Sequence, residues 1–257
     1  MAISDQELLK QRKIALTAGI SLIIMALAAS FSYGFAHRSL VVKGDASTTF
    51  INIMASSGLF KAEILGWLII LICDIVAAWA IYLFMKPFNK NLSLLGAWLR
   101  LSYATILGIA ITNLIYVLLL TNNSEYSSLW TINQLQANMM LSLEAFESIW
   151  SIGLIIFGGH LLIIAIVALQ SDQIPRIISI LILIAAIGYL VIHLSSSFFN
   201  QYDEIISLIE KIFIVPMTVL ALFLALAAAI SALMAFCMAA SKSLRLRCFS
   251  LSCADNC

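Results

Sequence analysis

Six stretches of this chain are long, apolar and almost free of charged residues. A membrane-spanning helix needs about 20 predominantly apolar residues. The intervals between charged residues place the predicted spans at about residues 14–36, 63–85, 92–120, 147–170, 177–199 and 213–240. The expected fold is therefore an all-α, polytopic membrane bundle of six transmembrane helices.

Composition excludes a water-soluble domain. The chain is 63% hydrophobic and 11% charged, whereas soluble domains carry about 25% charged residues. The mean hydropathy is +1.06. The net charge of +1 and the lack of a basic stripe give no reason to expect a nucleic-acid partner. We expect the lipid bilayer as the surroundings of the chain, and the bacterial inner (plasma) membrane as its location.

Lys and Arg are unequally divided between the two sides of the predicted bundle. Nine lie on the side of the termini and four on the other, and such an excess marks the cytoplasmic side. Both termini are therefore expected in the cytoplasm. Residues 1–240 form a single six-span domain in this interpretation, followed by a disordered cytoplasmic tail at 241–257.

The predicted connections differ in length between the two sides. The cytoplasmic turns are short and contain Pro87 and Pro175, which stop helix continuation. Spans two and three, and spans four and five, should therefore form antiparallel hairpins. The first outer connection is longer and is expected to hold an extended piece at 39–44, followed by an amphipathic segment at 50–59.

Three ionisable residues, Asp74, Arg100 and His160, stand alone within three of these spans. Such a group at bilayer depth costs at least ~2.5 kcal/mol for Asp or Arg. Counted from the cytoplasmic ends, they lie roughly 18, 15 and 18 Å deep, which is nearly one level. The short turn after span two places Asp74 and Arg100 on neighbouring helices. An ion pair between them is expected, because the partners then share the desolvation cost.

Two interpretations of this polar cluster remain open. The Asp74–Arg100 pair is either a fixed strut that specifies helix packing or a functional site for binding or proton transfer. His160 is either part of that site or a hydrogen-bonded core histidine.

A second group of polar residues lies toward the outer ends of spans four and five. These residues predict either a water-filled outer vestibule or a helix end that is simply polar and interfacial. The group consists of Glu144, Glu147, Tyr189, His193, Ser196 and Asn200.

Several short motifs, in order and spacing, resemble a known family. They include Arg38-Ser-Leu-Val-Val-Lys-Gly-Asp-Ala46, Ile155-Ile-Phe-Gly-Gly-His160 and Ile174-Pro-Arg-Ile-Ile178. Together they resemble the bacterial multi-pass membrane family catalogued as domain of unknown function 4386, over roughly residues 10 to 240. The resemblance implies a multi-pass membrane protein and no assigned activity. Members often carry an acidic residue shortly after the last-span proline, but none follows Pro216 here within six residues.

The sequence contains no HExxH zinc-protease motif, Gly-x-Ser-x-Gly elbow, nucleotide-binding loop or arginine ladder. We therefore expect no catalytic residues, metal or cofactor, and we favour a protein that is not an enzyme. The first functional hypothesis is a polar cluster that binds or conducts a small solute or a proton. The alternative is a non-transporting membrane protein, either a structural or partner-binding subunit or, less favoured, an intramembrane enzyme acting on lipid. A membrane-protein partner or a homo-oligomer is compatible with both.

Overall fold

The computed structural model describes residues 5–122, 130–171 and 174–198, and these residues form helices without any strand. The elements are α1 (Asp5–Ala29), η1 (Ser30–His37), α2 (Arg38–Leu40), α3 (Ala46–Ala55), α4 (Ser57–Met85), α5 (Lys90–Asn122), α7 (Ile132–Leu169) and α8 (Arg176–Phe198). The described part of the chain holds five helical segments long and apolar enough to cross a membrane. The all-α prediction is confirmed. The sixth predicted span and the predicted tail lie outside the described residues.

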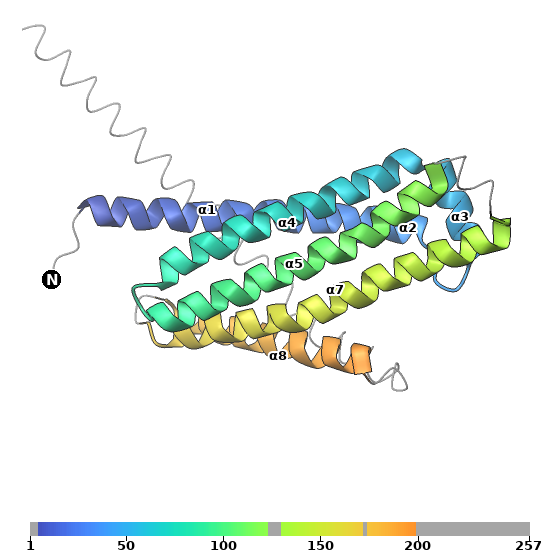
Figure 1. The fold of residues 1–257 in the computed structure, drawn as a ribbon. Helices are drawn as coiled ribbons and strands as arrows, with labels where there is room; N and C mark the ends of the chain where they lie inside the picture. The colour runs from blue at the N-terminus through green and yellow to red at the C-terminus, as the bar shows by residue number, and fades with distance from the viewer. Residues whose placement is uncertain (1–4, 123–129, 172–173, 199–257) are drawn as a thin grey trace, which may run out of the picture.

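The long helices lie side by side and alternate in direction (Figure 1). In chain order, α1 packs on α4, α4 on α5, α5 on α7, and α7 on α8. The predicted antiparallel hairpins are therefore present as α4/α5 and α7/α8. We call the end that holds these two turns and the start of α1 the short-turn end. The opposite end, with η1, α2 and α3, is the long-loop end (Figure 1).

The two short turns are linked to each other. Asn89 caps the start of α5, because its Oδ1 accepts a hydrogen bond from the backbone N–H of Leu92 at 3.1 Å. The Asn89 amide also donates to Gln170 Oε1 at the end of α7, over 3.3 Å. One side chain thus ends one helix hairpin and ties it to the next.

Helices α4 and α7 begin well before the charged residues that were expected to bound their spans. The predicted membrane spans begin at about residues 63 and 147, whereas the helices α4 and α7 begin at Ser57 and Ile132. Thr131 and Gln134 form a capping box that starts α7. Glu63 and Glu147 lie inside the helices because each has a partner there, so neither carboxylate marks a helix end.

The connection between η1 and α4 differs from the predicted one. The helical run continues to Leu40, so the extended backbone begins at Val41 (φ −97°, ψ 119°) rather than at residue 39. Gly44 turns the chain with a φ of 78°, which favours glycine. Asp45 then caps α3 by accepting from Thr48, and α3 begins four residues before the predicted 50–59 segment.

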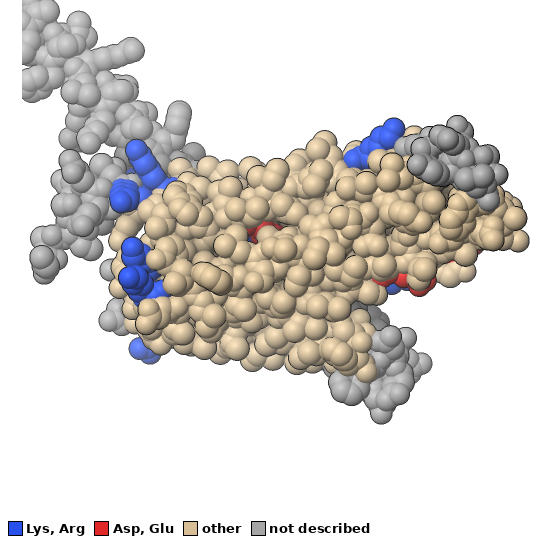
Figure 2. All heavy atoms as spheres, in the orientation of Figure 1, with Lys and Arg blue, Asp and Glu red and all other residues tan. Residues whose placement is uncertain are grey.

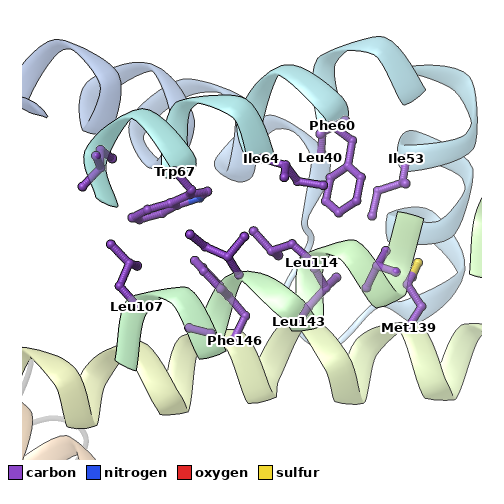
Figure 3. Packing of buried hydrophobic residues seen from close by; sticks show 14 of the residues in the cluster. Leu40, Ile53, Phe60, Ile64, Trp67, Leu107, Leu114, Met139, Leu143 and Phe146 are labelled. Atoms are coloured by element: carbon purple, nitrogen blue, oxygen red, sulfur yellow. The ribbon is translucent and has the colours of Figure 1, made fainter. Parts of the chain in front are cut away.

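The apolar interior is divided into two clusters. The larger cluster occupies the long-loop half, where Trp67 of α4 faces Leu107 of α5 and Phe146 of α7 (Figure 3). The smaller lies near the short-turn end around Ile164 and Ile182. Asp74 lies in the sequence between the α4 members of these clusters, Ile70 and Met85. Asp74 therefore lies between two apolar clusters.

The outer surface of the bundle is apolar as well. Lys and Arg gather near its ends, and the body between them is almost uniformly uncharged on the face shown (Figure 2). Large side chains such as Leu27 (68% exposed), Trp98 (66%) and Ile177 (71%) face outward. In water such a surface would be costly, at about 25 cal/mol per Å². A lipid environment removes that cost, so the structure is consistent with an integral membrane protein.

Candidate functional site

The three predicted ionisable residues meet at the centre of the bundle. Asp74 comes from α4, Arg100 from α5 and His160 from α7, and their exposures are 0%, 2% and 1%. Arg100 Nη2 lies 2.8 Å from Asp74 Oδ1, and Arg100 Nη1 lies 3.2 Å from His160 Nε2. We call these three residues the central triad. The predicted pair is present, and His160 joins it through Arg100.

The contacts of His160 define its tautomer. Its Nδ1 lies 2.8 Å from the carbonyl oxygen of Gly96. A carbonyl can only accept, so Nδ1 carries the hydrogen, and Nε2 accepts from the always protonated guanidinium of Arg100. His160 is thus a neutral imidazole that orients Arg100.

Apolar groups cover the guanidinium of Arg100. Met25 of α1 places its Sδ 3.7 Å from Nη2, and the Phe157 ring centroid lies 5.3 Å from Cζ, a cation–π contact. Yet the bonding is incomplete. Among the described residues, Asp74 Oδ2 and Arg100 Nε have no hydrogen-bond partner. The triad therefore keeps one acceptor and one donor unused in its buried interior.

The described residues of the predicted outer vestibule have different surroundings. His193 Nδ1 lies 3.0 Å from Ser151 Oγ in the contact between α7 and α8, and the Tyr189 ring stacks on His193 with centroids 5.8 Å apart. Glu144 and Ser196 are exposed. Asn200 lies outside the described residues.

Glu147 instead belongs to a second ionisable cluster that the sequence analysis missed. His37 of η1 places Nδ1 2.7 Å from Glu63 Oε1 of α4. The other ring nitrogen, Nε2, lies 3.4 Å from Glu147 Oε1 of α7. Lys43 Nζ is 3.9 Å from Glu147 Oε2. We call these four residues the His37 cluster.

Burial falls off across the His37 cluster. The side chains of Glu63 and His37 are 0% and 4% exposed, whereas that of Glu147 is 32% exposed and that of Lys43 is 84% exposed. The cluster thus runs from the protein interior to the surface at the long-loop end.

Sequence reasoning passed over His37 and Glu63 because both stand at the edges of charge-free stretches, where interfacial residues are ordinary. The only local signal was the apolar run Gly58-Leu-Phe60 before Glu63, which continues the helix past the charge. Their pairing spans 26 residues, and no local pattern reports it.

Aromatic rings fill the space between the two clusters. The Trp67 and Trp150 centroids are 4.9 Å apart, and Trp150 Nε1 donates to Tyr103 Oη over 3.4 Å. The Tyr103 ring lies 5.0 Å from Phe157, and Phe157 lies 5.6 Å from His160. Ring contacts, together with the hydrogen bond from Trp150 to Tyr103, therefore connect the long-loop half to the central triad.

Comparison with known proteins places the chain in a family. The family model described as domain of unknown function (DUF4386) matches residues 17–241. The chain belongs to this family. Both ionisable clusters lie within the DUF4386 match.

A protein of Archaeoglobus fulgidus described as uncharacterized is 30% identical over 129 residues. That alignment covers 50% of this chain and 64% of the other protein. No solved structure matches the chain.

Proposed function

We propose that this DUF4386 protein lets a proton or a small polar solute cross the membrane at the central triad. The observation that carries the proposal is the incomplete bonding of a buried ion pair. Buried polar atoms in proteins are normally hydrogen-bonded, and Asp74 Oδ2 and Arg100 Nε are not, among the described residues. Ionisable side chains inside membrane helices usually mark ion or proton pathways.

The chemistry of the triad suits proton exchange better than the binding of a large solute. Arg100 cannot lose its proton, and His160 is fixed as a neutral acceptor toward it. Asp74 is the member whose charge can change, and Oδ2 is the oxygen available to take a proton. Protonation of Asp74 would weaken its hold on Arg100 and loosen α4 from α5.

A second candidate function is a strut that fixes which helices pack together. The complete burial of all three side chains favours it, as does the cover of Met25 and Phe157 over Arg100. Such a strut suits a subunit that binds a membrane partner or forms a homo-oligomer.

Proteoliposomes separate these two functions. The full-length protein is placed in vesicles of phosphatidylethanolamine and phosphatidylglycerol with a pH-sensitive dye inside, and a potassium diffusion potential drives proton flux. We expect flux above that of empty vesicles, lost in both Asp74→Asn and Arg100→Gln although the variants insert and remain folded. Lys61→Gln, an exposed residue of α4 outside both clusters, is the matched control.

The opposite result supports the strut. It would be loss of fold in either single variant, together with recovery of the fold in the swap Asp74→Arg/Arg100→Asp. Absence of flux in the wild-type protein for protons and for small polar solutes would overturn the transport proposal directly.

We also propose that both termini face the cytoplasm of a bacterial inner membrane. The excess of Lys and Arg on the side of the short turns supports this orientation. Labelling of single cysteines introduced at Asn89 and Ser47 with a membrane-impermeant reagent in intact cells tests it. Labelling at Ser47 alone is the expected result, and labelling at Asn89 alone would reverse the orientation.

A further inference from the structure

The His37 cluster has an arrangement that the central triad lacks: a titratable ring stands between two carboxylates. Nδ1 faces Glu63 at 2.7 Å and Nε2 faces Glu147 at 3.4 Å, so the two carboxylates lie on opposite edges of one imidazole. One carboxylate is completely buried and the other is part exposed. Histidine is the side chain whose charge ordinarily changes near neutral pH.

We propose that His37 is a proton-exchange site that carries protons between the part-exposed Glu147 and the buried Glu63. The proposal deepens the proposed function, since it supplies the entry through which a proton from the long-loop side reaches the interior. It rests on that function only for the claim that protons move inward from His37 to the central triad. The exchange itself depends on the geometry of the cluster.

The transfer balances without any other reactant. The contact between Glu147 and His37 Nε2 is an ion-pair distance of 3.4 Å and not a hydrogen bond, so a small rotation of the Glu147 side chain comes first. Glu147, protonated from the aqueous side, then gives its proton to His37 Nε2. The resulting imidazolium releases the proton on Nδ1 to Glu63 Oε1, and the ring returns to neutral in its other tautomer. Glu147 is again a carboxylate and Glu63 is a carboxylic acid. Reversal of the two steps, or a flip of the ring, resets the site.

Unpaired buried atoms continue inward from the cluster and give independent support. Among the described residues, His37 Nε2 itself and, further inward, Glu63 Oε2, Ser32 Oγ and Trp67 Nε1 are buried and have no hydrogen-bond partner. Trp67 lies one turn after Glu63 on α4. A Cβ placed on Gly66 would overlap Ser32 Oγ, so Ser32 contacts the same turn. The indole N–H of Trp67 can only donate, whereas the hydroxyl of Ser32 can both donate and accept, so Ser32 Oγ is the atom here that could pass a proton on from Glu63.

The surroundings favour a proton over a metal ion as the occupant. The carboxylates face separate ring nitrogens, and within the described residues no group of His, Cys, Asp and Glu could hold a metal ion. From the neighbouring elements, Glu63 faces the ring from α4 and Glu147 from α7, and Lys43 lies beyond Glu147. The Tyr33 ring stacks on the His37 ring with centroids 5.5 Å apart, and the Phe146 ring centroid lies 6.0 Å from that of His37.

Histidine-selective ¹⁵N NMR of the full-length protein in lipid tests the site without any flux. The chain has three histidines, so His160→Gln and His193→Gln assign the His37 signals. We expect both ring nitrogens of His37 to titrate, and Glu63→Gln to move the midpoint down by about one pH unit or more. Glu147→Gln should give a smaller shift in the same direction, and Lys61→Gln none. A His37 midpoint that is the same in the wild type, Glu63→Gln, Glu147→Gln and Lys61→Gln would overturn the proposal.

Proton flux then tests how the site is used. In the vesicles described above, His37→Gln should lower the flux roughly tenfold or more, as expected when an acid–base group is lost. Because His37→Gln affects a buried position, Glu147→Gln serves as the milder variant, and its flux should lose the wild-type pH profile. Flux that needs Asp74 but is unaffected by both variants overturns the exchange site and leaves the proposed function standing. If the His37 midpoint shifts in Glu63→Gln but the wild-type protein carries no flux, the exchange site stands and the proposed function is overturned.

Discussion

The central triad and the His37 cluster both join α4 to α7, but their middle residues differ. In the triad the middle residue is Arg100, which holds Asp74 on one side and His160 on the other. In the His37 cluster it is a histidine between two carboxylates. An arginine keeps its charge at any physiological pH, whereas a histidine does not. The triad therefore has a permanent cation at its centre, and the cluster has one that depends on a proton.

Access to water follows the same division. No member of the triad is more than 2% exposed, and about 16 Å of helix separates Asp74 from Glu63. Aromatic rings occupy the space between. The His37 cluster reaches the surface through Glu147. The difference teaches that buried charge in one bundle can be fully enclosed at one level and reach the surface at another.

Removal of the permanent cation should have the largest effect. Arg100→Met leaves Asp74 charged and unpaired, and we expect a loss of about 3–5 kcal/mol in the free energy of unfolding. Denaturation in mixed detergent micelles, followed by tryptophan fluorescence, measures it. Asp74→Val/Arg100→Met should recover most of that loss. A single variant as stable as the wild type would show that the triad does not hold the helices together.

The two carboxylates of the His37 cluster should differ in their contribution to stability. Glu63→Gln weakens a buried, charge-assisted hydrogen bond, for which we expect a loss of about 1–3 kcal/mol. Glu147→Gln, at a part-exposed position, should cost at most about 1 kcal/mol. The same denaturation experiment compares them. Equal losses would contradict the gradient of burial across the cluster.

The close contact between Gly66 of α4 and Ser32 of η1, the element that carries His37, can be changed without altering a charged residue. Gly66→Ala forces Ser32 to move, and we expect a loss of about 1 kcal/mol. Ser32→Ala in the same chain should restore stability, because it removes the overlapping oxygen. Gly58→Ala is the matched control, since its Cβ would meet nothing within 4 Å. If Ser32→Ala does not rescue the variant, the close approach of η1 and α4 is not the cause.

The smallest effect is expected at the long-loop surface. The hydroxyl and backbone N–H of Thr48 donate to Asp45 and lower the pKa of that carboxyl. The stabilisation of α3 is therefore present above the unfolded pKa of about 4 and is lost as the pH falls through the lower folded value. Amide hydrogen exchange of α3 against pH measures it. Asp45→Asn should abolish the pH dependence over this range, and an unchanged dependence would assign it to another group.

The contact between Asp74 and Arg100 could be predicted because these two residues lie on consecutive helices joined by a short turn. A helix rises about 1.5 Å per residue, so distances from the short turn put Asp74 and Arg100 at one level, and the turn itself made their helices neighbours. The bond from His160 to Gly96 joins helices separated by 64 residues. No local sequence pattern predicts the Gly96 carbonyl as the partner of His160.

The helices α4 and α7 also extend further toward the long-loop end than the predicted spans. Charge was treated as the end of a span, which holds when the charge faces water. Glu63 and Glu147 are tolerated inside helices because His37 lies between them. Of the residues predicted to line an outer vestibule, Glu147 contacts His37 of η1, whereas His193 contacts Ser151 of α7.

The sequence by itself determined that this chain is an apolar helical bundle with an ion pair at its centre. The apolar composition and the depth of each residue along its helix can be read from the sequence without knowing the fold. Only the tertiary structure decided that His37, Glu63 and Glu147 form a second cluster, because their contacts depend on how η1 packs against α4 and α7. The exposed fraction of each carboxylate, which distinguishes the enclosed Asp74 from the part-exposed Glu147, is a property of that packing alone.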